Sequence, residues 1–309
     1  MRADQIALVR QFNRLVTQRV GALDDHFLGR GRPLGASRLL FEIGDRGGDL
    51  RDLRRWLNLD AGYVSRLIKA LEKEGLIRLA SHAVDQRVRT ARLTARGRRE
   101  MAELNARSDR LAADLLGAVP ESQRDRLVTA MTEVHRLLRA AGLEFERVDP
   151  ASPAARWCVT QYFTELDRRF PNGFDPGTSL HVDDCDFVPP RGTFLVASID
   201  GETVAGGSVR VTAPHVGWLK RMWVTESARG LGIGRRMLEA LESEARGLEI
   251  TLLRLETNRT LKEAIALYRK TGYRAVPAFN AEPYATHWYE KRLGKKLKLG
   301  RSTLRPASH

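Results

Sequence analysis

The stretch that decides the fold spans residues 217 to 234 and reads Gly217-Trp-Leu-Lys-Arg-Met-Trp-Val-Thr-Glu-Ser-Ala-Arg-Gly-Leu-Gly-Ile-Gly234. Its first part, residues 218–224, is typical of an apolar strand, and an amphipathic helix follows the glycines at once. The glycines let a bulky ligand approach the backbone, and the first helical turn offers free N–H groups and a positive dipole end. The stretch therefore predicts a pyrophosphate-binding turn, with a plain Gly-rich connection as the alternative.

Strands and helices alternate through the rest of the C-terminal half. We expect strands at 193–199, 204–211, 250–256 and 287–293, and helices at 157–170 and 261–271. This order, with the Arg-x-x-Gly-x-Gly turn, resembles the GNAT superfamily of N-acetyltransferases, whose mixed sheet is splayed at its middle. It does not match the dinucleotide fingerprint, because the spacing Gly-x-Gly-x-x-Gly is absent.

The resemblance implies acetyl-CoA as co-substrate and assigns residues to it. The backbone of Met222, Trp223 and Val224 would pair with the pantetheine arm as an added strand does. Leu261 stands where many relatives have an asparagine, so Asn258 is the candidate for that contact. The residues that match the pyrophosphate loop are Arg229, Gly230, Gly232, Ile233, Gly234 and Arg235.

Tyr268 matches the family's tyrosine beside the CoA sulfur. Its role would be that of the general acid that protonates the departing thiolate, with half-buried packing as the alternative. The glutamate that often serves as base on the central strand is missing here. The amine would then lose its proton through ordered water or to His287, whose ordinary pKa suits the task, although His287 could equally be a packing residue.

The acceptor end of the site is predicted from polar and aromatic residues near two loops. Cationic side chains among them suggest an acceptor that carries a carboxylate or phosphate as well as an amine. Each of these residues could instead be a surface group. The candidates are Arg169, Lys220, Arg221, Asn280 and Tyr284.

The N-terminal half predicts helices interrupted by one hairpin. A short helix around Leu50–Leu57 precedes a second helix at 61–74, which Asp60 caps and Gly75 closes. Two short strands follow at 76–79 and 88–93, and seven arginines stand against one acid from Arg78 to Arg99. The order closely resembles winged-helix regulators of the MarR family. The resemblance implies that Tyr63, Ser65, Arg66 and Lys69 of the recognition helix, with Arg87 and Arg89 of the wing, bind duplex DNA.

In that family the terminal helices form a dimer that reads a pseudo-palindromic operator. The matching segments here are residues 4–23 and 121–143, where apolar residues form a stripe. The stripe could instead pack within its own chain, and the helix-turn-helix could serve assembly alone. We nevertheless expect a homodimer.

Charge divides the chain in the same way. The net +14 comes from residues 1–149, with 28 basic and 21 acidic groups, and from residues 291–309, with seven basic groups and no acid. Residues 150–290 are balanced, as expected for a domain that binds a small molecule. Cys158 and Cys185 show neither metal spacing nor a disulfide framework, which predicts no metal site and suits a cytoplasmic protein. The absence of a signal sequence and of a long apolar run argues against a membrane partner.

The sequence thus predicts an all-α-rich winged helix followed by an α+β acetyltransferase. We expect a DNA-binding and dimerisation domain at 1–146, a linker at 147–153, a GNAT domain at 154–293 and a basic disordered tail at 294–309. The predicted function is that of a regulator that also acetylates a small amine. The alternative is a transcription factor whose GNAT domain senses acetyl-CoA without catalysis.

Overall fold

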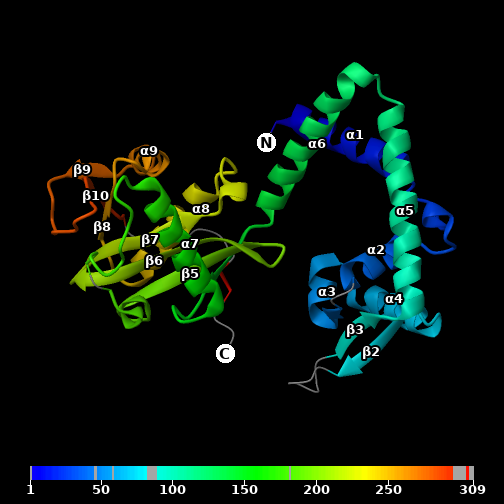
Figure 1. Cartoon of the computed structure of the whole chain (residues 1–309), viewed down its shortest axis with the longest axis horizontal. Helices are drawn as coiled ribbons and strands as arrows, with labels where there is room; N and C mark the ends of the chain where they lie inside the picture. The colour runs from blue at the N-terminus through cyan, green and yellow to red at the C-terminus, as the bar shows by residue number, and fades with distance from the viewer. Residues whose placement is uncertain are drawn as a thin grey trace. The chain divides into compact units, whose positions relative to one another are not determined.

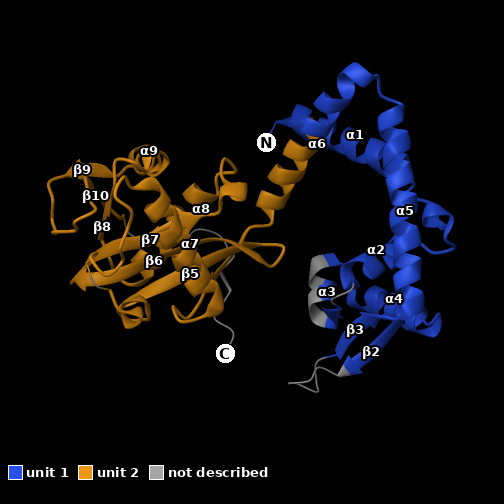
Figure 2. Cartoon of the chain, in the orientation of Figure 1, with its two compact units in different colours: residues 1–129 blue, residues 130–309 orange. Residues whose placement is uncertain are grey.

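The computed structural model describes residues 2–44, 47–57, 59–81, 89–180, 182–294 and 304–305. It divides into two compact units, residues 1–129 and residues 130–309 (Figure 2). The division falls inside one helix, whereas the sequence suggested a boundary after residue 146. No helix within the described ranges is long and apolar enough to cross a membrane.

The first unit is helical, with one small sheet (Figure 1). Its core is built from α2, α3, α4 and the sheet, and includes Leu39, Leu53, Leu71 and Ile77. Two long helices, α5 and α6, follow the sheet, and the order of helices and strands before them is that of a winged helix. The helices are α1 (Ala3–Arg19), α2 (Leu34–Ile43), α3 (Leu50–Leu57), α4 (Ala61–Lys73), α5 (Ala95–Gly117) and α6 (Glu121–Ala141), with a short 3-10 turn η1 (Phe27–Gly29).

Local sequence explains where α4 begins and ends. The Asp60 carboxylate accepts a hydrogen bond of 2.9 Å from the Tyr63 N–H, which satisfies one of the free donors of the first turn. Gly75 takes φ +69°, a conformation that ends a helix and favours glycine. The two strands after it, β2 (Ile77–Ser81) and β3 (Arg89–Leu93), pair antiparallel, and β1 (Gly48–Asp49) joins β3 on its other edge.

The second unit is built around an eight-stranded sheet of order β11-β4-β5-β6-β7-β8-β10-β9. Neighbouring strands are antiparallel except for the pairs β7–β8 and β11–β4. The strands are β4 (Glu144–Arg147), β5 (Gly192–Ile199), β6 (Glu202–Ala213), β7 (Val216–Val224), β8 (Leu252–Thr257), β9 (Arg274–Val276), β10 (His287–Arg292) and β11 (Leu304–Arg305).

Helices cover both faces of this sheet, because its strands are apolar on both sides. Along β5, Phe194 and Val196 pack with α7 (Pro153–Arg169), whereas Leu195 and Ala197 belong to the core beneath α8 (Ile233–Gly247). The helix α9 (Lys262–Lys270) follows β8 and contributes Tyr268 to the same core as α8. Two 3-10 turns, η2 (Asp184–Phe187) and η3 (Glu226–Ala228), complete the unit.

The middle of the sheet is split between β7 and β8. These strands pair only from Val216 to Trp218 on the β7 side, and beyond that point their pairing ends. A bulge lies on the other edge of β7, where the register with β6 shifts between Gly206 and Ser208. Arg221, inside this bulge, has φ +55°, in the left-handed region that few non-glycine residues adopt. The predicted mixed, splayed sheet is therefore confirmed.

Two strands of this sheet lie in segments for which the sequence analysis predicted no strand. Residues 144–147 form β4 and pair with β5, although they span the end of the expected first domain and the start of the expected linker. Residues 274–276 form β9, for which no strand was expected. The expected disordered tail lies outside the described residues except for Gly294 and for β11, which pairs with β4.

Candidate active site and DNA-binding surface

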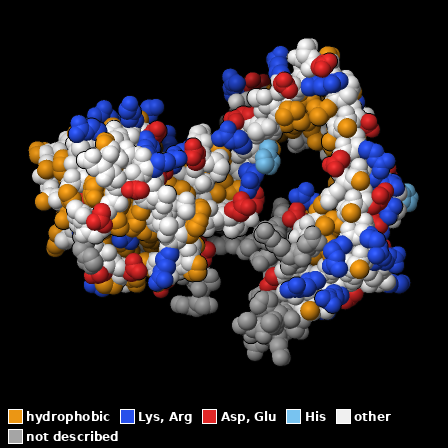
Figure 3. Space-filling view, in the orientation of Figure 1, with side chains coloured by type: hydrophobic (Ala, Val, Ile, Leu, Met, Phe, Trp, Pro, Cys, Tyr) orange, Lys and Arg blue, Asp and Glu red, His pale blue; other side chains and the backbone are white. Residues whose placement is uncertain are grey.

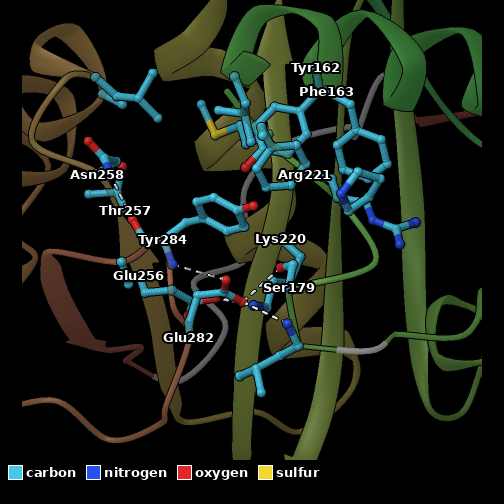
Figure 4. Close-up of a pocket in the computed structure, with 18 of the residues that line it drawn as sticks. Tyr162, Phe163, Ser179, Lys220, Arg221, Glu256, Thr257, Asn258, Glu282 and Tyr284 are labelled. Carbon is cyan, nitrogen blue, oxygen red and sulfur yellow. Dashed lines mark hydrogen bonds and ion pairs between the residues drawn. The ribbon is translucent and has the colours of Figure 1, made fainter. Parts of the chain in front are cut away.

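A cavity of about 390 Å³ opens where β7 and β8 separate. Figure 4 shows it between Tyr162 and Phe163 of α7, Lys220 and Arg221 of β7, and Glu256 of β8. Tyr268 of α9 also lines it, so the cavity contains the predicted acid and part of the predicted cofactor strand. Further lining residues are Leu166, Phe170, Phe174, Leu219, Met222, Thr257, Asn258, Leu261, Ala264, Glu282, Tyr284 and Ala285.

The glycine turn has the geometry that the sequence predicted for it. Gly230 and Gly232 have φ +80° and +74°, and the space beside each Cα is open. Gly232 is the N-cap of α8 and supplies no side-chain hydrogen bond to the first turn. The peptide N–H groups of this turn are therefore placed for an anion at a positive helix end.

Arg229 holds the turn through its side chain. Its guanidinium donates to the Glu165 carboxylate of α7 and to the Val224 carbonyl of β7. Glu165 also accepts a hydrogen bond of 2.8 Å from the Trp223 indole N–H and one of 3.0 Å from Arg169. Burial acts to raise the pKa of Glu165, but Arg169, Arg229 and Trp223 outweigh it and lower this pKa below its ordinary value. No local pattern in the sequence indicates that a residue of α7 anchors the turn.

Two tyrosines face the cavity in their neutral form. Burial raises the pKa of Tyr268 above its ordinary range, and the nearby charge of Glu256 adds to this effect. Burial likewise raises the pKa of Tyr162. Both phenols therefore keep their protons at neutral pH and can donate them, which is what a general acid requires.

Two of the predicted acceptor residues are engaged with carboxylates. Arg169 donates to Glu165, to Glu263 at 2.7 Å and to the Thr260 carbonyl at 2.8 Å. The Lys220 ammonium donates to the Glu256 carboxylate, and both side chains are nearly buried. Neither cation is available to a substrate anion without breaking an existing ion pair.

Arg221, by contrast, makes no hydrogen bond and no ion pair with any described residue. Its guanidinium lies over the rings of Phe163 and Phe187, with distances to the ring centroids of 5.7 and 5.0 Å. Burial lowers its pKa, and the charge of Asp184 opposes this only in part. Arg221 is thus the predicted acceptor cation that lines the cavity without a carboxylate partner.

Some of the remaining predicted site residues line the cavity, and others do not. Asn258 lines the cavity, but its amide donates to the Tyr284 carbonyl and accepts from the Thr260 N–H. The Tyr284 hydroxyl accepts from the Asp175 N–H and so ties down the loop after α7. His287, Asn280, Arg235 and Ile233 are not among the cavity-lining residues.

The first three of these four are engaged elsewhere. The His287 ring forms a hydrogen bond of 2.9 Å with the Thr286 hydroxyl and stacks on Tyr289. The side-chain oxygen Oδ1 of Asn280 accepts a hydrogen bond from the Trp288 indole N–H. Arg235 forms an ion pair with Glu239 on the exposed side of α8. The structure does not bring His287 to the position expected of a base.

The recognition helix presents the predicted polar residues on one side. Arg66 and Lys69 are exposed, and the Arg66 guanidinium lies 5.9 Å from the centroid of the Tyr63 ring. Ser65 is partly buried and accepts a hydrogen bond from Arg54 of α3. Arg89 is exposed at the start of β3, whereas Arg87 lies outside the described residues.

The two halves together define a class of protein: a winged helix followed by an α+β domain with a split sheet and a glycine turn at a helix N-terminus. Comparison with known proteins agrees with this class. The family model described as the acetyltransferase (GNAT) family matches residues 159–273, and a winged helix DNA-binding domain model matches residues 38–97. The chain belongs to the GNAT acetyltransferase family, and it carries a winged-helix DNA-binding domain.

Individual relatives match the C-terminal half. An IAA acetyltransferase of Azospirillum brasilense is 41% identical over 117 residues, which cover 37% of this chain and 76% of that protein. The uncharacterized N-acetyltransferase YjgM of Escherichia coli K12 is 31% identical over 96 residues, or 29% of this chain and 56% of that protein. An acetyltransferase of the GNAT family from Staphylococcus aureus MU50 is 16% identical, with 49% of this chain and 99% of that chain covered and a TM-score of 0.42.

These findings confirm both resemblances read from the sequence. The chain is an N-acetyltransferase with an acyl-CoA co-substrate, as family membership implies, joined to a winged helix that suggests DNA binding.

Proposed function

We propose that this chain transfers the acetyl group of acetyl-CoA to the amine of a small, carboxylate-bearing acceptor, and that it binds DNA as a homodimeric regulator. The single observation that carries the transferase part is the cavity at the split between β7 and β8. It has the neutral Tyr268 in its wall, and α8 with its glycine turn follows β7 directly in the chain. A thioester bound along β7 would reach this cavity with its pyrophosphate on the turn.

The reaction is direct transfer without a covalent enzyme intermediate. A neutral amine attacks the thioester carbonyl, and peptide groups at Met222 to Val224 polarise that carbonyl. The C–S bond then breaks, and Tyr268 protonates the departing thiolate. Arg229 contributes by holding the turn, since its guanidinium is bound to Glu165 and Val224 rather than free to contact phosphate.

Arg221 supports an acceptor that carries an anion. It is the cation of the cavity without a carboxylate partner, and burial has already removed part of its hydration. A bound carboxylate would regain those interactions through charge-assisted hydrogen bonds. The aromatic rings that line the cavity, Phe163 and Phe174 among them, favour an acceptor with an apolar body.

A panel assay tests this function. The full chain would be incubated with acetyl-CoA and a panel of amino acids and other amines, and free CoA and acetylated product would be measured by mass spectrometry. We expect turnover of an amine that carries a carboxylate, and a much higher KM for its decarboxylated analogue. Arg221→Gln should remove this difference between the two acceptors. Turnover that ignores the carboxylate in the wild-type chain would contradict the acceptor assignment.

The DNA-binding part rests on the winged helix and on exposed apolar faces of α1 and of α6, each taken by itself. Side chains of these helices that would normally be buried are exposed, and Figure 3 shows hydrophobic groups on them. A two-fold dimer would cover such faces and present two recognition helices to a pseudo-palindromic site. The exposed residues are Ile6, Leu8, Val9, Phe12, Leu15 and Val16 of α1 and Met131, Val134, Leu137 and Leu138 of α6.

One contact favours the second candidate, a DNA-binding protein that responds to acetyl-CoA. Arg136 of α6 donates a hydrogen bond of 3.0 Å to the carbonyl of Arg229, the first residue of the glycine turn. Arg236 of α8 donates to the carbonyls of Ala140 and Leu143 at the end of α6. Since α6 also carries one of these apolar faces, a ligand on the turn could bias the helix that mediates assembly.

The two candidates differ in what acetyl-CoA does to DNA affinity. In the sensor, adding acetyl-CoA changes the affinity of the intact protein for its operator, and Arg136→Gln abolishes the change while acetyl-CoA still binds. In the enzyme without coupling, DNA affinity is the same with and without the ligand. Fluorescence anisotropy on a selected operator fragment measures both affinities.

A further inference from the structure

The cavity contains a carboxylate oxygen that nothing in the described structure satisfies. The Glu256 side chain is 7% exposed; its Oε1 accepts from the Lys220 ammonium, and its Oε2 is buried without a hydrogen-bond partner. Among the residues that the structure describes, Glu256 Oε2 is the only buried carboxylate oxygen without a hydrogen-bond partner. An unsatisfied buried acceptor is costly, so its retention calls for a functional explanation.

The other carboxylate in the cavity wall behaves differently. Glu282, shown with Glu256 in Figure 4, accepts from the Ser179 hydroxyl and the Leu180 N–H through Oε2, and from the Tyr284 N–H through Oε1. Its oxygens are used to hold the loop that closes the cavity. Glu282 therefore has a structural role, and Glu256 is the carboxylate of the described cavity wall with an oxygen that no hydrogen bond engages.

We propose that Glu256 is the general base of the transferase, with Lys220 as its positioning residue. This inference rests on the proposed acetyl transfer. Glu256 lies at the end of β8, in the wall that also contains Tyr268, so base and acid face one cavity. Lys220 fixes the orientation of the carboxylate through Oε1, and Oε2 is the oxygen that would take the proton of the acceptor amine.

The proton balance of the step is as follows. The acceptor ammonium gives one N–H proton to Glu256 Oε2, and the freed lone pair attacks the thioester carbon. The C–S bond breaks as the thiolate takes the proton of the Tyr268 hydroxyl. The second N–H proton of the acceptor returns to the Tyr268 oxygen as the amide forms, and Glu256 releases its proton to solvent. The products are the acetamide, CoA thiol and one proton.

Glu256 is a better candidate than the residues considered from the sequence. His287 lies outside the cavity lining and is hydrogen-bonded to Thr286. The central strand β7 carries no acidic side chain, as its residues Val216 to Val224 show. The base is therefore supplied by the neighbouring strand, across the split through which the thioester is expected to enter.

The test compares Glu256→Gln with a matched control in the full chain. Glu290→Gln removes the same charge from the adjacent strand β10, where Glu290 pairs with Arg254 away from the cavity. With the amine found in the panel assay as the probe, we expect Glu256→Gln to lower kcat by about 100-fold. It should also abolish the fall of kcat/KM at low pH, while the Kd for acetyl-CoA, measured by calorimetry, changes less than twofold. Glu290→Gln should leave all three quantities unchanged.

A second variant keeps the proposal falsifiable if Glu256→Gln folds poorly. Lys220→Met removes the partner but leaves the carboxylate, so kcat should fall less than in Glu256→Gln while the Kd for acetyl-CoA changes less than twofold. A Glu256→Gln protein with kcat within threefold of wild type and an unaltered pH profile would overturn the assignment and leave the proposed function standing. A wild-type chain that binds acetyl-CoA but acetylates no amine would overturn both.

Discussion

Each unit of this protein buries a carboxylate against cations, and the two carboxylates are satisfied to different degrees. In the winged-helix unit, Glu100 accepts from Arg30 and Arg32 through both oxygens, and Arg32 also binds Glu74. In the transferase unit, Glu256 has one cation, Lys220, and one oxygen without a partner. A fully satisfied cluster stabilises the fold around it, whereas an incompletely satisfied one retains a group that can react.

The surroundings agree with this distinction. Glu100 joins α5 to the turn between α1 and α2, and nothing predicted to bind a ligand touches it. Hydrogen bonds from Arg30 lower the pKa of Glu100 to about 2, against the opposing effect of burial. Glu256 instead lines a cavity with Tyr268 and Tyr162. We therefore expect changes in the first cluster to alter stability and changes in the second region to alter rate.

The largest effect should come from Tyr268→Phe. Loss of the phenol removes the proton donor of the leaving thiolate, so kcat should fall by about 100-fold while stability changes little. Tyr289→Phe is a suitable control, since the Tyr289 hydroxyl is buried without a partner and outside the cavity. Steady-state rates and thermal unfolding of both variants test the prediction. Equal rates for Tyr268→Phe and wild type would remove Tyr268 from the mechanism.

The pKa of Tyr268 gives this prediction a pH dependence. Burial raises that pKa, so the donor stays protonated through and above neutral pH, and kcat should show no alkaline fall below about pH 10. An alkaline limb nearer neutrality that disappears in Tyr268→Phe would mean that the phenol ionises more readily than its burial implies.

Glu100→Gln should have the next largest effect, and it should act on stability alone. The folded-state pKa lies below the unfolded value, so the cluster contributes stability above the unfolded pKa near 4.5 and loses it as pH falls toward 2. We expect the variant to lower the unfolding free energy of the first unit by about 2 kcal/mol at neutral pH. Urea unfolding at pH 7 and pH 3 should show a difference that narrows at the lower pH. Transferase activity should be unaffected.

How far the sequence predicted these features depends on how local each feature is. Asp60, Gly75 and the glycines from 230 to 234 act on backbone within a few residues, so the helix α4 and the glycine turn before α8 could be predicted with their boundaries nearly correct. Tyr268 was found because its motif lies in one helix. β4 was missed because a four-residue strand gains its stability from pairing with β5, about fifty residues away.

The base illustrates the limit for the site. The sequence placed Glu256 at the end of a predicted strand, but nothing local shows that β7 and β8 separate there or that Lys220 lies opposite. The anchoring of Arg229 by Glu165 is equally non-local, because it joins α7 to the turn. Both features depend on long-range register, which hydrophobic periodicity in a single sequence does not reveal.

Arg66→Ala should have the smallest effect, and that effect should be on DNA binding. Unlike the arginines that bind Glu100 and the lysine that binds Glu256, Arg66 has no carboxylate partner among the described residues. Arg66 is exposed on α4 and makes no ion pair with the described residues, so it contributes little to the stability of its unit. Its loss should weaken binding to duplex DNA by about 1 kcal/mol if it reads a base. If it contacts phosphate instead, the affinity loss should be similar across sequences and the salt slope should fall by about one.

Arg110→Ala is the matched control for this change. Arg110 carries the same charge on the exposed side of α5 and donates only to the Ala106 carbonyl of its own helix. Affinities measured at several salt concentrations, on a selected operator and on unrelated duplex, separate the two roles of Arg66. Equal losses for Arg66→Ala and Arg110→Ala would mean that the winged helix contributes net charge rather than a recognition surface, and that unpaired arginines on this unit are not by themselves functional.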